Sequence, residues 1–231
     1  MGVSNGFKRK IHQWMMTEDG QVAFRPFLVD GNPYKSRIFV AGAFPHPVIE
    51  VEADEHEEYV ESLVDAELWG AFYGDRMQSR ENKGTAAFIQ WLKEACGETV
   101  VNVNVTALMA ESAKKLKEHG KEAPGDYKKG FDVFQETVQE FLPEFLILHG
   151  AEAVKQFRKQ FGAGLSDHHP HIDKVQDLEE VGAFAEWQLA NGGRVKVLAC
   201  RNLSHYGKRG EAFEVFKERI REMMAETGDE C

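Results

Sequence analysis

The chain has 231 residues and a mass of 26.1 kDa, which suits one large α/β domain better than two full domains. Its composition is 42% hydrophobic and 29% charged, which is typical of a globular protein and excludes a disordered chain. The formal net charge of −10 excludes a uniformly basic nucleic-acid-binding surface but leaves room for a local basic patch.

The three cysteines, Cys96, Cys200 and Cys231, are far apart in the sequence and form no C-x-x-C pair. They cannot supply the four thiolates of an iron–sulfur cluster, and they suit a reducing compartment. No apolar run approaches the ~20 residues of a membrane span, and no secretory signal follows the basic N-terminal residues. We therefore expect a cytoplasmic protein.

Four short apolar runs are predicted to be strands, and they alternate with segments in which apolar residues recur at helical spacing. The predicted strands are residues 37–41, 99–105, 145–149 and 195–200. The predicted helices are residues 5–16, 52–69, 85–95, 130–141, 151–161 and 209–225. Loops or irregular segments are predicted at residues 17–36, 74–84 and 167–173, and the charged segment 114–125 is expected to be exposed.

This alternation predicts an α/β fold with a mainly parallel sheet that is covered by helices on both faces. We expect a single domain over residues 1–231, with a three-layer αβα architecture and a four-stranded central sheet. Residues 1–23 would form an N-terminal extension of a core at about 24–225. Ligands of such sheets bind at the carboxyl ends of the strands, so the candidate site residues follow the four predicted strands.

Two of these strand ends carry residues that suit ligand binding. G-A-F-P-H (residues 42–46) predicts a rigid turn whose backbone amides can face a ligand, although a simple strand exit explains it equally well. The second strand carries Asn102 and Asn104 on one side, where a buried parallel strand is normally apolar. Because an unpaired buried amide costs about 1–3 kcal/mol, Asn104 either presents its amide to a ligand or bonds the backbone, and the sequence favours neither.

The fourth strand is followed by R-N-L-S-H-Y-G-K-R-G (residues 201–210). His205 in this segment can stabilise a developing anion, while Ser204, backbone amides and Lys208 or Arg209 can bind a phosphate. The alternative is an ordinary polar loop.

Two further histidine motifs carry weaker signals. His149-Gly150, after the third strand, is more typical of a packing glycine than of a site. His168, His169 and His171, with Asp167 and Asp173, have ligand types that suit a divalent metal. Neighbouring residues on an extended loop point apart, however, so we predict no metal site there.

The order of these motifs resembles that of the uracil-DNA glycosylase superfamily. G-A-F-P (residues 42–45) stands where that family ends its first strand in G-x-D/N-P, and Asn104 where a middle strand ends in asparagine. F-L-P-E-F-L-I-L-H-G-A-E-A-V (residues 141–154) matches a helix, proline, apolar strand and G-x-x-A helix, and R-N-L-S-H-Y-G (residues 201–207) occupies the place of the H-P-S loop. The resemblance covers about residues 24–225 as an ordered pattern.

The chain departs from the family at two motifs. Phe44 stands in place of the acidic or amide residue that positions water, and Asn202 and Leu203 replace the histidine and proline of H-P-S, of which Ser204 persists. His205 is a candidate for the missing histidine's role. These departures point away from ordinary uracil and towards a larger modified pyrimidine; the superfamily includes anti-phage enzymes that remove glucosylated hydroxymethylcytosine.

The resemblance implies a monofunctional DNA glycosylase that flips out a modified or deaminated pyrimidine and hydrolyses its N-glycosidic bond, in base-excision repair or anti-phage defence. The catalytic residues would be His205, Asn202, Asn104 and Asp75. The substrate-binding residues would be Gly42, Ala43, Phe44, Pro45, His46, Phe72, Tyr73, Asn104 and Ser204. DNA would contact Ser204, Tyr206, Lys208 and Arg209. We expect a monomer whose partner is double- or single-stranded DNA with a modified base, with no membrane association, no metal and no other cofactor.

Two other functions remain open. The first is a catalytically inert nucleic-acid-binding module of the same fold, which the residues at Phe44 and Asn202 favour. The second is a metal-dependent hydrolase that uses residues 167–173, and it predicts sensitivity to a chelator.

Overall fold

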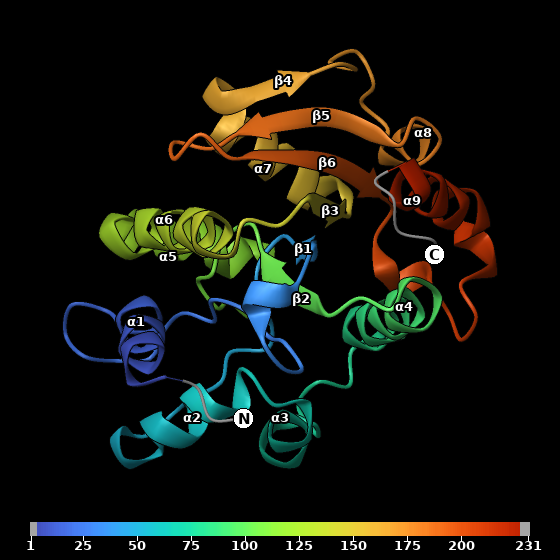
Figure 1. Ribbon diagram of the computed structural model, residues 1–231. Helices are drawn as coiled ribbons and strands as arrows, with labels where there is room; N and C mark the ends of the chain where they lie inside the picture. Colours follow the sequence, from blue (N-terminus) through green and yellow to red (C-terminus); the bar gives the residue numbers. More distant parts are fainter. Residues whose placement is uncertain (1–3, 227–231) are drawn as a thin grey trace.

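The computed structural model describes residues 4–226, which form one sheet with the strand order β2-β1-β3-β6-β5-β4 and helices around it (Figure 1). The chain is therefore an α/β protein, and Cys231 lies outside the described residues. Strands β2, β1, β3 and β6 are parallel, whereas β5 and β4 continue the sheet antiparallel to them. The strands are β1 (Ile38–Gly42), β2 (Val100–Asn104), β3 (Phe145–His149), β4 (Leu165–Asp167), β5 (Ala183–Gln188) and β6 (Arg194–Cys200).

The prediction of a four-stranded sheet was wrong in the number of strands. All four predicted strands are present and form the parallel part, but β5 and β4 add an antiparallel extension beyond β6. Strand β4 has only three residues, none of them fully buried, so its sequence lacks the apolar run that indicates a strand. It pairs with β5 rather than with the parallel strands.

The predicted helices are present, but most of their bounds differ, and residues 113–122 and 175–178 form helices that the sequence did not indicate. Residues 52–69 form two helices: the first ends at Ser62, and Asp65 caps the second by accepting hydrogen bonds from the amides of Glu67 and Leu68. The predicted loop 74–84 ends early, since Ser79 caps a helix that begins at Arg80. The helices are α1 (Asn5–Met15), α2 (His56–Ser62), α3 (Ala66–Tyr73), α4 (Arg80–Cys96), α5 (Ala113–Glu122), α6 (Pro124–Phe141), α7 (Ala151–Phe161), α8 (Val175–Leu178) and α9 (Glu214–Glu226).

The two faces of the sheet carry separate apolar cores, as a three-layer arrangement requires. On one face, Phe39, Val101 and Leu146 pack with residues of α1, α2, α6 and α7. On the other face, Val40 and Ile147 pack with residues of α4 and α9. Helix α1 belongs to the first core, so the N-terminal segment from residue 5 packs with the rest of the domain. Among residues 4–226, no helix is long and apolar enough to cross a membrane.

Residues 22–29, which run along the free edge of β2, have extended backbone. Isolated bridges join Phe24 to Leu108 and Leu28 to Asn102. The Leu28 amide donates to the Asn102 carbonyl at 2.7 Å, and the Asn102 amide donates back at 2.8 Å. This edge segment covers the outer strand and becomes one wall of the site described below.

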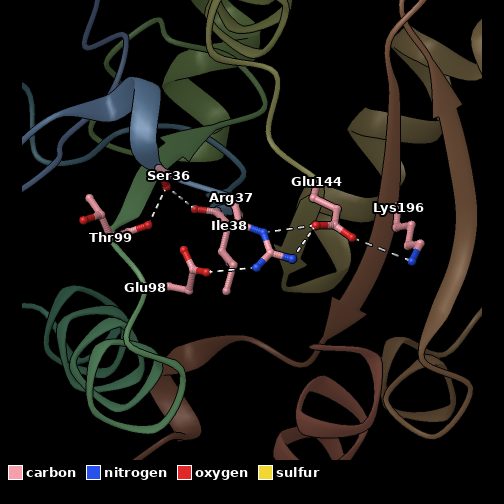
Figure 2. Close-up of polar contacts among 7 residues, drawn as sticks. All are labelled: Ser36, Arg37, Ile38, Glu98, Thr99, Glu144 and Lys196. Carbon is pink, nitrogen blue, oxygen red and sulfur yellow. Dashed lines mark hydrogen bonds and ion pairs between the residues drawn. The ribbon is translucent and has the colours of Figure 1, made fainter. Parts of the chain in front are cut away.

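A polar network ties together the amino ends of the parallel strands (Figure 2). Arg37, just before β1, contacts Glu144 at 2.6 Å and Glu98 at 3.3 Å, and Glu144 also lies 3.9 Å from Lys196 of β6. The Ser36 hydroxyl lies 2.6 Å from the Thr99 carbonyl, next to the start of β2. The network links the starts of all four parallel strands, and the opposite edge of the sheet carries the candidate site.

Candidate functional site at the carboxyl ends of the parallel strands

A cavity of about 380 Å³ runs along β2 from Val100 to Asn104 and reaches the carboxyl ends of β2 and β3 and the turn after β1. Its walls come from the edge segment, from α2 and α3, and from α4 between Glu81 and Lys93. Its size lies within the roughly 300–1,000 Å³ of small-molecule sites, and its position at the carboxyl ends of parallel strands is the usual one for ligands of this class of sheet. The charged and polar side chains that line it include Arg25, His46, Glu81, Asn102, Asn104 and His149.

Gly42, the last residue of β1, lets two polar side chains converge above the strand end. A methyl group on Gly42 would lie 2.7 Å from Asn104 Oδ1 and 3.1 Å from His149 Nε2. The first distance is shorter than real Cβ contacts and the second is tighter than most of them, so a side chain at position 42 would displace the Asn104 amide. Asn104 is 8% exposed and His149 is 4% exposed. The predicted residues Gly42 and Asn104 are therefore neighbours, and His149 joins them.

Glu81 is the acidic group of the site. It lies in the first turn of α4, where the helix dipole favours a negative charge. Its carboxylate is 3.6 Å from His46 Nε2 and 3.6 Å from His149 Nδ1, and the Asn202 side chain is close enough to stabilise its negative charge. Burial by itself would raise the pKa of Glu81, but contacts with His46, His149 and Asn202 outweigh burial and lower it. Glu81 is consequently ionised at neutral pH.

His149 is a deeply buried titratable group at this edge. Burial lowers its pKa to about 4, against the opposing effect of the Glu81 carboxylate, so the imidazole is neutral at neutral pH. Its Nδ1 atom is buried and has no hydrogen-bond partner within 3.5 Å, the Glu81 oxygen being slightly beyond that distance. A buried polar atom of this kind is costly unless it is paired, and a small shortening of the Glu81 contact would pair it.

Asn202, after β6, completes the polar group. Its Oδ1 accepts a hydrogen bond of 2.8 Å from the Ser204 amide and so caps the short 3-10 helix Leu203–His205. Asn202 also lies close to the end of β3, because a methyl group on Gly150, the residue after that strand, would lie 3.2 Å from Asn202 Nδ2. Gly150 also has a φ of 88°, which favours glycine. Residues at the ends of β1, β2, β3 and β6 thus lie around Glu81.

The predicted turn at residues 42–46 contributes to the site in part. Phe44 and His46 line the cavity, and their rings lie 6.0 Å apart. Ala43 and Pro45 are not among the residues that line the cavity. Their carbonyl oxygens accept hydrogen bonds from the backbone amides of Thr106 and Ala110 at 3.2 and 3.1 Å. These bonds hold the turn against the segment that follows β2.

Several other predicted site residues are not among the residues that line the cavity. Phe72 is 46% exposed, and Tyr73 packs on Trp69 with ring centroids 4.8 Å apart. Asp75 and His205 are exposed. Only Asn104, Phe44 and His46 of the proposed base-contacting set line the cavity.

The predicted DNA-contacting residues divide by exposure. Tyr206 is 3% exposed and packs between Phe88 and Phe213, so its ring belongs to the core. Ser204 is partly exposed, and Lys208 and Arg209 are exposed. Gly84 of α4 allows this loop to approach, because a methyl group there would lie 1.8 Å from the Leu203 carbonyl oxygen.

The histidine segment at residues 167–173 is held in place by Arg158. Arg158 donates to Asp167 at 2.8 Å and to the carbonyls of Ile172 and His169 at 3.0 and 3.2 Å. Within residues 4–226, no three His, Cys, Asp or Glu side chains are grouped so that they could hold a metal ion. The segment therefore gives no support to the metal-dependent hydrolase.

Sequence reasoning missed Glu81, His149 and Arg25 as site residues. Ser79 followed by an acid in the next two residues is a helix N-terminal signal, and it would have placed Glu81 on a helix facing the strand ends. Arg25 interrupts the otherwise apolar run V-A-F-R-P-F-L-V at residues 22–29, and a charge in such a run is a signal in itself.

Comparison of the sequence with models of known protein families gives no match, and comparison with functionally characterised proteins gives no significant similarity either.

Proposed function

We propose that the protein is a DNA glycosylase that takes a flipped-out, modified or deaminated pyrimidine into the cavity and hydrolyses its N-glycosidic bond. The observation that carries the proposal is that an ionised carboxylate, Glu81, and a buried amide, Asn104, line the same cavity at the ends of parallel strands. The ordered motif resemblance over residues 24–225 gives the reaction class.

The reaction needs a group that stabilises positive charge on the sugar and accepts a proton from water. As the C1′–N bond breaks, its electron pair leaves with the base, and water then adds to C1′. We assign both tasks to Glu81, because its carboxylate is ionised and partly shielded from solvent. His46 and His149 would orient the carboxylate, as general-base groups commonly need a second group to hold them. Glu81 replaces Asp75 as our candidate for the water-orienting residue.

The base itself would be bound by Asn104 and Phe44. An asparagine amide can donate and accept at once, which suits the carbonyl and imide edge of a pyrimidine, and its N–H can stabilise the leaving base anion. Phe44 offers an aromatic face for stacking. The cavity of about 380 Å³ has room for a pyrimidine that carries a substituent.

Four exposed cations on two adjacent segments would bind the DNA backbone. Arg80 and Lys83 lie in the first turn of α4, and Lys208 and Arg209 follow β6. The side chains of these four residues form no ion pair within the described residues. The two segments adjoin at the Gly84–Leu203 contact. Unpaired cations next to a base-binding cavity can hold phosphates despite the net charge of −10.

The proposal is tested by base release from duplex and single-stranded DNA that carries uracil, hydroxymethyluracil, hydroxymethylcytosine or its glucosylated forms, with abasic sites scored by alkaline cleavage. We expect release from at least one substrate, and its loss in Glu81→Gln. Glu94→Gln is the matched control, because Glu94 lies on the same helix but is exposed and bonded only to Gln90.

One observation favours the inert binding module as a second candidate. Asn202 stands where the family has its histidine, and His205, the substitute, is exposed and outside the set of residues that line the cavity. No base release from any substrate, with DNA still bound in a salt-dependent way, would favour that candidate over the glycosylase.

A further inference from the structure

The cavity wall opposite the strand ends contains a buried cation, Arg25. It lies in the edge segment, where its amide donates to the Ala107 carbonyl at 2.9 Å, so its backbone is fixed against the chain after β2. The residue is 4% exposed, and it lines the cavity together with Trp69 and Met77. The small remaining exposure of Arg25 is therefore towards a space that a ligand can fill.

Arg25 has no anionic partner within the described residues. Its side chain has two contacts: Met77 Sδ at 3.8 Å and the face of the Trp69 ring at 5.6 Å from the centroid. Tyr59 acts on Arg25 electrostatically, but burial raises the pKa of its hydroxyl well above the ordinary value, so it stays neutral. Burial lowers the pKa of Arg25 to about 10, and the guanidinium is still protonated at neutral pH.

The two carboxylates of the cavity are already engaged elsewhere. Asp30 pairs with Lys93 at 2.9 Å, and Glu81 contacts His46, His149 and Asn202. Buried charges in proteins are normally paired, because a low-polarity environment makes an unpaired charge very unfavourable. Arg25 is thus a charge whose partner is missing, at a cavity that can admit one.

We propose that Arg25 binds an anionic oxygen group, a carboxylate or a phosphate, on the ligand that occupies this cavity. A guanidinium has five donors in a planar fork that matches either group, and a sulfur contact and a stacked ring leave most of these donors free. The ionised Glu81 repels the same group, so the ligand's anionic end is directed to Arg25. Since the ligand class rests on the proposed function, the ligand is a pyrimidine that carries an acidic substituent or, as its nucleotide, a terminal phosphate monoester.

The test measures binding rather than catalysis. Calorimetric titration compares uracil with uracil-5-carboxylate, and deoxyuridine with deoxyuridine 5′-monophosphate, with inorganic phosphate as a fifth probe. We expect one anionic probe to bind the unaltered protein at least ~10-fold more tightly than its neutral counterpart, the range of a charge-assisted hydrogen bond. The first pair reports a ring carboxylate, and the second pair and the free ion report a phosphate.

Three variants separate ligand binding from folding. Arg25→Met is expected to lose about 10- to 100-fold in affinity for the anionic probe and nothing for the neutral one, and Arg25→Lys to lose less. Arg76→Met, which removes an exposed arginine outside the cavity lining, is expected to bind as the unaltered protein does. Because Arg25→Met removes an unpaired buried charge, its melting temperature should not fall; a structural arginine would make it fall.

Each outcome has a defined meaning. Equal affinity for charged and neutral probes, no binding of any of the three anionic probes at millimolar concentration, or unchanged binding of the anionic probe in Arg25→Met would overturn the assignment of Arg25. Base release from DNA together with equal affinity of Arg25→Met and the unaltered protein for the anionic probe would overturn the assignment of Arg25 while leaving the glycosylase intact. Anionic probes that bind through Arg25, with no base released from any DNA, would instead support Arg25 and refute the glycosylase.

Discussion

Replacement of Gly84 by alanine tests the contact that brings α4 and the loop after β6 together. Gly84 lies inside α4, and a methyl group there would be 1.8 Å from the Leu203 carbonyl oxygen. Such atoms essentially never approach within 3.0 Å, so the loop backbone or the helix must move by about 1.2 Å. The oxygen belongs to the residue next to Asn202, and Glu81 lies one helical turn before Gly84. The same movement therefore separates Glu81 from Asn202.

Two opposing effects set the size of the change in stability. Alanine is favoured over glycine inside a helix by about 1 kcal/mol, whereas overpacking of a well-packed contact costs about 1–3 kcal/mol. A backbone displacement of more than an ångström belongs near the upper end of that cost, so we expect a net loss of roughly 2 kcal/mol in the free energy of unfolding. For a chain of this size, this corresponds to a fall of roughly 4–8 °C in Tm.

Gly70→Ala is the matched control, because Gly70 is also inside a helix, is exposed, and has no atom within 4 Å of the added methyl group. This variant should gain about 0.5–1 kcal/mol from helix propensity alone. Thermal and urea denaturation of both variants measure the difference. If Gly84→Ala is as stable as Gly70→Ala, the close packing of α4 on the loop after β6 is refuted. In the base-release assay, Gly84→Ala should lose about 10²-fold in rate, because small displacements of reacting groups are costly.

The remaining predictions concern the site. Glu81→Gln should slow base release by about 10²–10⁴-fold with DNA affinity unchanged, and a rate equal to that of the wild type would refute the role of Glu81. Because the pKa of Glu81 is lowered, the activity that depends on its carboxylate should persist as the pH falls to 4.5. Asn104→Ala should slow base release by about 10²–10³-fold. The double variant Lys208→Ala/Arg209→Ala should reduce the slope of log affinity against log salt by about 2 for duplex DNA, and an unchanged slope would mean that this loop is not at the interface. Burial lowers the pKa of His149 to about 4 from 6.5, so His149 takes up a proton in the unfolded chain before it does in the folded protein as the pH falls. The stability that the neutral ring contributes is therefore complete above pH 6.5 and is lost between pH 6.5 and 4, by up to about 3 kcal/mol. Urea titrations of His149→Gln across this pH range should lack this loss.

The sequence alone predicted the parallel part of the fold because the signals for it are local. Apolar runs of about five residues indicated β1, β2, β3 and β6, and helical spacing indicated α7 over the residues that it occupies. The edge strand β4 was missed because it is short and not fully buried, so its strand conformation depends on pairing with β5. The start of α4 was missed because Gly84 weakens the helical pattern, although packing against Leu203 requires a glycine there.

The residues of the candidate site likewise fall into a group that the sequence predicted and a group that it did not. Phe44, His46 and Asn104 were predicted because each follows a strand that the sequence indicates, and the carboxyl ends of parallel strands meet at one edge. Glu81 and Arg25 come from a helix and an edge segment whose positions depend on tertiary packing, whereas His149 ends a strand that the sequence indicates but was interpreted as part of a packing motif. Whether a histidine is neutral, a glutamate ionised or an arginine unpaired depends on burial and on neighbours that are far away in sequence. The local sequence thus determined which strand ends face the ligand, and only the folded chain decided which charges surround it.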